Sequence, residues 1–351
     1  MHFFISDMSE LATMRNAERS CGAKMARLGK ALGAGFVVPR GFILDVSACR
    51  EALDDSAVSE AVGAAMEGID ADSSPDTLAS VRPRVAAALE QFALQEDLLE
   101  SLREACEALG DGTRLAVRSS APGEDAHDAS FAGQFETTLG VVGFDAMMEA
   151  IRRCWSSPYS ASALAYRASR GILEAPMPMA VGVLELVDAK VAGVAFSVHP
   201  VTRRKNRIVI EANWGLGETV VAGRVSPDHI EVGKTDLRIL DYAIGGKQRV
   251  AAFDASEGRV VERAAGPEES SVRCLTDDEA MLVAAATVEL EDTFGHAVDV
   301  EWALVAGDDG EPSRLVILQV RPETIQEEPM ALRSGYDPIG MILERTSRRL
   351  P

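Results

Sequence analysis

Two strands near the end of the chain carry residue types that bind metal ions and phosphates. Their predicted ranges are 297–305 and 314–322, and a hairpin that turns symmetrically about Gly310 determines which residues face each other. Because side chains alternate along a strand, four polar side chains share one face of this hairpin: Asp299, Glu301, Gln319 and Arg321. Apolar side chains occupy the other face: Val300, Trp302, Leu304, Val316, Leu318 and Val320.

The polar face of this hairpin suits a complex of a metal ion with a phosphate. Glu301 is predicted to lie opposite Gln319, and a carboxylate beside an amide oxygen is a good ligand pair for a hard cation such as Mg²⁺. Arg321 lies next to them and can neutralise a phosphate through two parallel hydrogen bonds. Geometry alone favours the alternative, an exposed polar face without a ligand. A one-residue shift in register would break the pairing.

A second candidate lies where a buried strand runs into a polar loop. Residues 115–117 are predicted to form the strand, and Arg118 follows it directly. The loop after Arg118 reads SSAPGEDAHDASFAGQ and closes at Phe135. A guanidinium group beside the backbone N–H groups of such a loop can hold an anion. A surface loop with an ion-paired arginine explains the same residues equally well.

Two weaker signals remain. Lys24 lies in the segment Cys21-Gly22-Ala23-Lys24, near the start of a predicted helix over 18–34. A lysine in the first turn of a helix can help the N-terminus to hold a phosphate, although a solvated lysine is the commoner case. The segment 208–218 is predicted to be a buried strand that enters a glycine turn. Glycines there permit close approach of a ligand, or they simply form the turn.

Common nucleotide and zinc signatures are absent from the sequence. Gly233-Lys234-Thr235 resembles the end of a P-loop, but the position of its leading glycine is occupied by Asp228. No GxGxxG motif follows a predicted strand, and the five histidines form no HxxxH pair. These patterns exclude a P-loop or Rossmann protein.

Composition narrows the class of protein further. The 351 residues, 47% of them hydrophobic, allow two or three domains and exclude general disorder. The formal net charge of −20 disfavours nucleic acid and anionic membranes as partners. An odd number of cysteines, five, without a CxxC pair favours small buried thiols in a reducing compartment. Without a signal peptide or an apolar run of about 18 residues, we expect a soluble, cytoplasmic protein.

The elements that must position these residues differ between the two halves of the chain. The first half is predicted to be rich in helices, at 18–34, from 46 to about 110 and at 144–172, with short strands at 40–44 and 115–117. Strand-like runs dominate later, at 179–198 and 207–244, and one helix at 276–294 precedes the final hairpin. We therefore predict a helix-rich lobe over 1–178, a sheet-rich lobe with the metal-binding hairpin over 179–325, and a basic tail over 326–351.

Taken in order, these segments resemble the ATP-binding domain of the phosphoenolpyruvate synthase and pyruvate phosphate dikinase family. The similarity runs from about Gly22 to Thr324. Five stretches carry it: GAKMARLGKALGAGFVVPRGF, LAVRSSAPGEDAHDASFAGQFETTLGV, VAGVAFSVHPVT, IVIEANWGLGETVVAGRVSPD and VDVEWALV with LVILQVRPET. The resemblance implies an α+β fold, the two-lobed ATP-grasp, whose lobes close on ATP. That expectation agrees with the change of pattern near 175–180.

The resemblance also implies roles for the matching positions. Lys24 and Arg118 would hold the ATP phosphates, with Thr137 or Thr138 touching them from the closing strand. The other implied ligands are the backbone of Leu184, Glu185, Leu186 and Val187 for adenine, Glu211 for the nucleotide, Glu301 and Gln319 for Mg²⁺, and Arg321 for the phosphates. Lys24, Arg118 and Arg321 would be catalytic. Two departures concern peripheral contacts: the segment 157–162 lacks the family's usual arginine, and Leu184 replaces a common glutamine.

The implied activity is ATP-dependent phosphotransfer through a histidine. In the family this histidine follows Thr-Ser or Thr-Cys, and none of the five histidines here has that context. We therefore expect a partner subunit that carries the phosphorylatable histidine and the acceptor site. In size and content the chain resembles the ATP-binding subunit of phenylphosphate synthase, which phosphorylates phenol in anaerobic phenol degradation. A non-catalytic nucleotide-sensing subunit and a stand-alone kinase that releases ADP are the alternatives.

Overall fold

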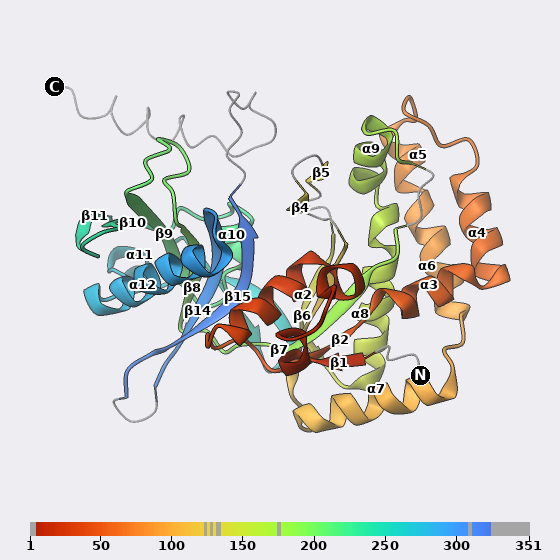
Figure 1. The fold of residues 1–351 in the computed structure, drawn as a ribbon, viewed down its shortest axis with the longest axis horizontal. Helices are drawn as coiled ribbons and strands as arrows, with labels where there is room; N and C mark the ends of the chain where they lie inside the picture. Colours follow the sequence, from red (N-terminus) through yellow and green to blue (C-terminus); the bar gives the residue numbers. More distant parts are fainter. Residues whose placement is uncertain are drawn as a thin grey trace.

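The computed structural model describes residues 5–122, 125–126, 129–130, 135–173, 177–307 and 311–323. The predicted turn at Gly310 and the predicted tail over 326–351 lie outside these residues. Two large antiparallel sheets and their covering helices make up the described part, which confirms the α+β class (Figure 1). No helix within the described ranges is long and apolar enough to cross a bilayer.

A five-stranded sheet organises the helix-rich part of the chain. Its strands follow the order β1 (Ile5–Asp7), β2 (Gly41–Leu44), β7 (Ala180–Glu185), β3 (Arg114–Ser120) and β6 (Thr137–Val142). Much of its apolar core lies between this sheet and helices whose buried leucine, valine and alanine side chains recur at helical spacing. The helices are α3 (Val46–Asp54), α4 (Ser56–Met66), α5 (Pro75–Ala79), α6 (Val81–Gln91), α7 (Glu96–Leu109), α8 (Phe144–Ser156) and α9 (Ala161–Ser169), with the 3₁₀ turn η1 (Ser157–Tyr159).

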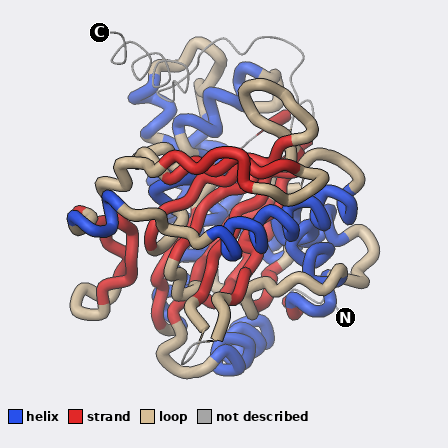
Figure 2. Tube along the Cα trace, turned by 90° about the vertical axis from the view of Figure 1, so that its left-hand side faces the viewer, coloured by secondary structure: helices blue, strands red, loops and turns tan. Residues whose placement is uncertain are grey.

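A six-stranded sheet forms the second part, and Figure 2 shows its strands side by side. Their order is β11 (Ile239–Ala243), β10 (Asp228–Gly233), β9 (Arg207–Trp214), β8 (Val191–Phe196), β14 (Val298–Val305) and β15 (Arg314–Pro322). A second apolar core joins this sheet to α12 (Asp277–Phe294) and to α2 (Ala17–Gly33), which contacts β15. The smaller elements are α1 (Met8–Leu11), α10 (Glu218–Val221), α11 (Pro267–Ser271) and the hairpins β4 (Asp125–Ala126) with β5 (Ala129–Ser130) and β12 (Arg249–Asp254) with β13 (Arg259–Ala264).

The division of the chain at residues 178 and 179 remains a prediction. β7 begins directly after that point, yet it pairs with β2 and β3 inside the five-stranded sheet. Strand pairing therefore extends the first sheet as far as Glu185. The β12–β13 hairpin was not predicted, because β13 is mostly exposed and carries Arg259, Glu262 and Arg263 instead of an alternating apolar pattern.

The predicted pairing of the final hairpin is confirmed at the polar residues. Asp299 lies opposite Arg321, and Glu301 lies opposite Gln319. The register shifts directly after Glu301, where Trp302 faces Ile317. The prediction that Leu318 and Val316 share the face of Trp302 is therefore wrong, because the bulge inserts one residue in β15 and Val316 now lies opposite Ala303. Ile317 takes the place in the core, where it is 2% exposed.

The cysteines are reduced in the structure and mostly buried. Four of the five are buried and Cys106 is partly exposed, so the prediction of small buried side chains holds for four. Burial raises the pKa of the Cys49 and Cys154 thiols to about 12. Such thiols stay protonated at neutral pH and act as apolar side chains.

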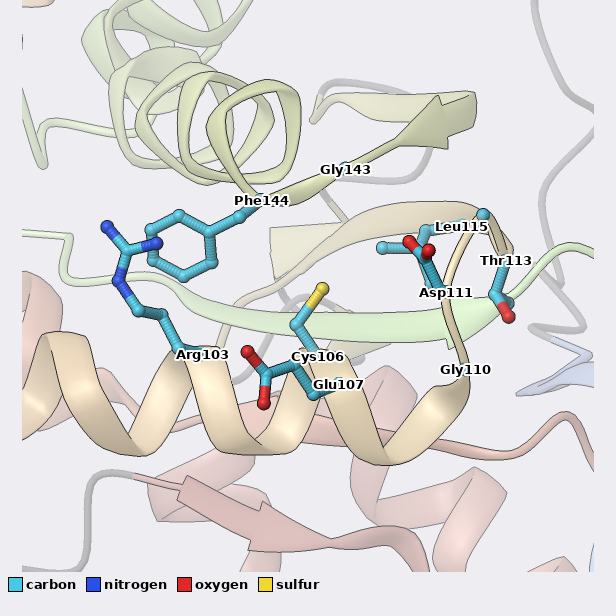
Figure 3. Close-up of a pocket in the computed structure, with 10 residues that line it drawn as sticks. Arg103, Cys106, Glu107, Gly110, Asp111, Thr113, Leu115, Gly143 and Phe144 are labelled. Atoms are coloured by element: carbon cyan, nitrogen blue, oxygen red, sulfur yellow. The ribbon is translucent and has the colours of Figure 1, made fainter.

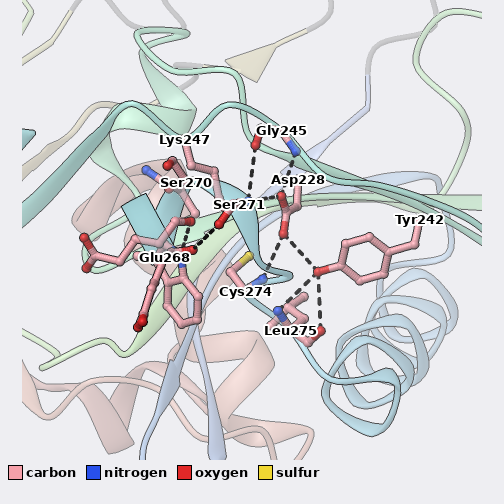
Figure 4. Close-up of polar contacts among 12 residues, drawn as sticks. Asp228, Tyr242, Gly245, Lys247, Glu268, Ser270, Ser271, Cys274 and Leu275 are labelled. Carbon is pink, nitrogen blue, oxygen red and sulfur yellow. Dashed lines mark hydrogen bonds and ion pairs between the residues drawn. The ribbon is translucent and has the colours of Figure 1, made fainter. Parts of the chain in front are cut away.

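A fully buried ion pair ties three segments of the second part together (Figure 4). Asp228 and Lys247 are both 0% exposed and pair directly. The Asp228 carboxylate also accepts hydrogen bonds from the Gly245 N–H (2.8 Å), the Cys274 N–H (2.9 Å) and the Tyr242 hydroxyl (3.1 Å). Asp228 thus joins β10 to the segments that follow β11 and precede α12.

Replacement of Asp228 should strongly destabilise the protein. Asp228→Asn leaves the Lys247 ammonium group buried without its counter-charge, and we expect a loss of about 3–5 kcal/mol in the free energy of unfolding. Urea unfolding followed by circular dichroism measures it. Asp241→Ala, on an exposed position of β11, is the control. Equal stability of the two variants would contradict this role.

Candidate functional site

Arg118 links the two sheets. It stands on β3 and donates from one nitrogen to the carbonyl oxygen of Leu318 (2.9 Å). Its other terminal nitrogen donates to Oε1 of Gln319 (2.7 Å) and to Oε2 of Glu301 (3.2 Å). The structure thus brings together residues about 200 positions apart, which the sequence had assigned to two separate candidate sites.

Glu301 is the centre of this group. Its second oxygen, Oε1, accepts hydrogen bonds from Arg321 (2.9 Å) and from the Gln319 amide (3.2 Å). Arg321 also lies 3.4 Å from the Asp299 carboxylate. We name Arg118, Asp299, Glu301, Gln319 and Arg321 the arginine–carboxylate cluster. Its four charged side chains are 12–19% exposed, so its interactions are only partly screened by water.

The cluster keeps Glu301 ionised. Burial is the largest influence on its pKa and raises it, but the charges of Arg118, Arg321 and Lys24 oppose burial and prevail. The net pKa is therefore below the usual value. Because the folded-state pKa is lowered, Glu301 contributes stability above its unfolded pKa of about 4.3, and this is lost as the pH falls through the folded pKa.

Lys24 approaches the cluster from α2. Its Nζ donates to the carbonyl oxygen of Ser119, 3.5 Å away, and the residue is 9% exposed. α2 is broken at Gly22, whose φ of 74° is not helical, so Lys24 lies in the first turn after the break. The Ala23 N–H donates to the carbonyl of Ala121 at 3.1 Å. This contact places the lysine beside the strand that carries Arg118.

Gly22 is required by this close approach. A Cβ atom there would lie 2.2 Å from the carbonyl oxygen of Ser120. We expect Gly22→Ala to lower the free energy of unfolding by about 2 kcal/mol or more. The matched control is Gly35→Ala, which shares the positive φ (94°) but has nothing within 4 Å of the added methyl group. Thermal unfolding compares them, and an equal loss would show that the contact with Ser120 is unimportant.

Strand register separates the two threonine candidates. Thr137 lies opposite Arg118 on β6, and Thr138 lies opposite Val117. Paired residues share a face, so Thr137 lies on the side of Arg118 and Thr138 on the side of the buried Val117. The phosphate-binding role remains a prediction, and the register favours Thr137 for it.

The predicted adenine segment, residues 184–187, includes the last two residues of β7 and the two that follow. Leu184 lies opposite Ala116 and Gly41 inside the sheet. The N–H of Glu185 donates to the carbonyl of Arg40 (2.8 Å), and the N–H of Leu186 donates to that of Arg114 (2.7 Å). These two donors are occupied, so a purine would have to use the Val187 N–H or the carbonyl groups of the segment.

Glu211 lies on the same face of the six-stranded sheet as the cluster. Val194 on β8 pairs with both Glu301 and Glu211, which places the two carboxylates two strands apart, roughly 10 Å. Glu211 faces His229 on β10, with 3.8 Å between carboxylate and ring. The structure therefore places Glu211 beside the cluster but outside it.

The cluster offers oxygen ligands of the kind that Mg²⁺ prefers. Glu301 and Gln319 provide a carboxylate and an amide oxygen on adjacent strands. No group of three or more histidine, cysteine, aspartate or glutamate side chains is arranged for a metal within the described ranges. Mg²⁺ is commonly held by one or two carboxylates together with phosphates and waters, so this donor set fits an ion that arrives with a nucleotide.

Two contacts of the site could not be identified from the sequence. The Leu318 carbonyl meets Arg118 at the bulge in β15, and no residue type signals a bulge there. The Glu136 carbonyl accepts hydrogen bonds from the N–H (3.1 Å) and the hydroxyl (2.9 Å) of Ser119. Main-chain acceptors carry no signature in the side-chain pattern.

A cavity of about 310 Å³ lies apart from the cluster (Figure 3). It opens between the end of α7, the start of β3 and the start of α8, and Arg103 stacks on Phe144 at one side, 4.1 Å from the ring centre. None of the predicted site residues lines it. The lining residues are Arg103, Cys106, Glu107, Gly110, Asp111, Gly112, Thr113, Leu115, Gly143 and Phe144.

Comparison with known proteins identifies the family of the chain. The family model described as pyruvate phosphate dikinase, AMP/ATP-binding domain, matches residues 18–335. A probable phosphoenolpyruvate synthase of Methanothermobacter thermautotrophicus is 35% identical over 308 residues, 86% of this chain and 44% of the relative. The phosphoenolpyruvate synthase of Aeropyrum pernix is 32% identical over 332 residues, 87% of this chain and 40% of the relative.

The relative from Pyrococcus furiosus, also a phosphoenolpyruvate synthase, is 31% identical over 370 residues, 93% of this chain and 45% of the relative. The chain thus spans less than half the length of these three relatives. The family match, in contrast, extends over most of the chain and includes every residue of the cluster. The chain belongs to the pyruvate phosphate dikinase AMP/ATP-binding domain family.

Proposed function

We propose that the chain binds MgATP at the arginine–carboxylate cluster, in the manner of an ATP-grasp, and delivers the β-phosphoryl group to a histidine on a partner subunit. The net reaction would convert ATP, water and an acceptor to AMP, Pi and the phosphorylated acceptor. The convergence of Arg118 from one sheet with Glu301, Gln319 and Arg321 from the other carries this proposal.

The charges at the cluster suit a polyphosphate. Arg118, Arg321 and Lys24 supply three positive charges against the carboxylates of Glu301 and Asp299. Phosphoryl transfer depends mainly on positioning and on neutralisation of phosphate charge, which these side chains would provide. Bound Mg²⁺ would neutralise further charge on the phosphates beside Glu301 and Gln319.

Arg118 has donor capacity that the protein does not use. Its Nε is buried and has no hydrogen-bond partner among the described residues. One of its two terminal nitrogens is hydrogen-bonded to the side-chain oxygens of Glu301 and Gln319, the two residues proposed to bind the metal. On nucleotide binding, the guanidinium group would exchange Glu301 and Gln319 for phosphate oxygens, which would release both side chains to the ion.

The partner is proposed from the chemistry of the reaction. His229 on β10 and His199 in the segment between β8 and β9 lie 3.8 and 3.7 Å from the carboxylates of Glu211 and Glu231. Neither follows the Thr-Ser or Thr-Cys pair that precedes the accepting histidine of the family. An accepting histidine on a second subunit would match the arrangement of phenylphosphate synthase, with phenol as one acceptor to test.

The experiment follows the β-phosphate. The protein, tagged and purified gently from its native cells, is incubated with MgATP labelled at that phosphate, and the products are separated. We expect AMP and acid-labile label on a co-purifying chain. ADP without AMP would instead identify a kinase that acts directly on an acceptor. Bound ATP with neither label nor turnover would identify a nucleotide sensor.

A further inference from the structure

Arg82 joins the helical part of the protein to the strand segment beside Arg118. It lies in the first turn of α6, and its guanidinium group pairs with the Glu136 carboxylate. The same group donates to the Ser156 hydroxyl and to the Arg153 carbonyl, both at 3.2 Å. The two charged side chains are only 30% and 26% exposed, so the pair is partly shielded from water.

The main chain of Glu136 connects Arg82 to Ser119. Its carbonyl oxygen holds both the N–H and the hydroxyl of Ser119, and Ser119 is 0% exposed. Ser119 follows Arg118 directly, and its own carbonyl accepts the hydrogen bond from Lys24. Thr137, opposite Arg118, follows Glu136 directly. Three of the predicted phosphate contacts, Arg118, Lys24 and Thr137, therefore adjoin the Glu136–Ser119 link.

The helices that carry Arg82 and its partners are fixed by apolar packing. Val81, Val85 and Leu89 on α6 are fully buried, and α6 packs against α8, as Figure 1 shows. Ser156 and Arg153, the other partners of Arg82, belong to α8. A site is positioned best when its supporting side chains are fixed by packed elements and by several hydrogen bonds.

We infer that Arg82, through Glu136, is a positioning residue that sets Ser119, Arg118 and Lys24 for the phosphates of the nucleotide. The inference rests on the proposed MgATP site. Arg82 does not touch the cluster, and nothing in the helical pattern of 46–110 distinguished it. If the ion pair only stabilised the fold, removal of Arg82 would leave the ratio of the affinities for ATP and adenosine unchanged. If Arg82 positions the phosphate contacts, its removal should weaken the binding of ATP more than the binding of adenosine.

The experiment measures the affinity of the full chain for ATP with Mg²⁺ and for adenosine by titration calorimetry. We expect Arg82→Ala to weaken ATP binding about tenfold and to leave adenosine binding within twofold of the wild type. Arg84→Ala is the matched control, because Arg84 lies on the same helix but bonds the Ala64 carbonyl at 2.8 Å. It should change neither affinity.

A variant of Glu136 tests whether Arg82 acts through this residue. Glu136→Gln should reproduce the ATP defect, and the double variant should be no weaker than either single one, because both substitutions break one link. Unchanged ATP affinity in Arg82→Ala, or an equal loss for adenosine and ATP, would overturn the inference. Wild-type protein that binds no ATP would instead refute the proposed function.

Discussion

Replacement of Arg118 by alanine should abolish transfer of the β-phosphoryl group. The side chain connects β3 to Leu318, Gln319 and Glu301, and its guanidinium group would neutralise the phosphates during transfer. We expect at least about a 10³-fold lower rate of AMP formation, in line with other arginines at phosphoryl groups. The assay is the labelling reaction with the co-purified partner.

A suitable control for this variant removes an exposed arginine that lies outside the arginine–carboxylate cluster. Arg259 pairs with Glu257 beside the β12–β13 turn, and its side chain is 68% exposed, so Arg259→Ala should keep wild-type turnover. Circular dichroism and thermal unfolding establish that the Arg118→Ala protein is folded. Turnover within threefold of the wild type would remove Arg118 from the site.

Replacement of Glu301 by glutamine should weaken the binding of the metal ion to the complex of the protein with ATP. Glutamine keeps the shape of the side chain and loses the charge that Mg²⁺ needs from a ligand. We expect Mn²⁺ to bind the protein–ATP complex at least about tenfold more weakly and the rate of AMP formation to fall about 100-fold. Electron paramagnetic resonance of Mn²⁺ measures binding, independently of turnover.

The matched control is Glu257→Gln, at an exposed position of the β12–β13 turn. It removes one negative charge from the same acidic protein, so any change it causes reports net charge alone. Equal Mn²⁺ affinities in the Glu301 and Glu257 variants would contradict the assignment of Glu301 as a metal ligand. Gln319 would then be left without a carboxylate partner for the ion.

Much of the local architecture could be predicted from residue spacing. The helix predicted at 276–294 is α12, Asp277–Phe294, and Thr276 caps it through Glu279, as its sequence suggests. The pairs Glu301–Gln319 and Asp299–Arg321 followed from alternation along two apolar strands. These features depend on neighbours within one element or one hairpin, where the number of possible arrangements is small.

Other features of the site required the folded chain. The bulge after Glu301 moves Leu318 off the core face and presents its carbonyl to Arg118. Nothing in the sequence distinguishes Arg82 from other helical arginines, whereas in the fold its guanidinium group pairs with Glu136. Neither contact is encoded by spacing, because each joins segments whose approach depends on the packing of several other elements.

The family, most of the elements and the pairing of the polar residues in the β14–β15 hairpin could be predicted from the sequence alone. Those depend on residue order and on short-range periodicity, which a single chain displays directly. Three other features depend on the folded chain: Arg118 contacts Glu301, Thr137 rather than Thr138 shares the face of Arg118, and the Glu185 and Leu186 amides already donate hydrogen bonds within the protein. Such contacts are set by how the two sheets and their helices bury their apolar faces together, a long-range outcome that no local pattern specifies.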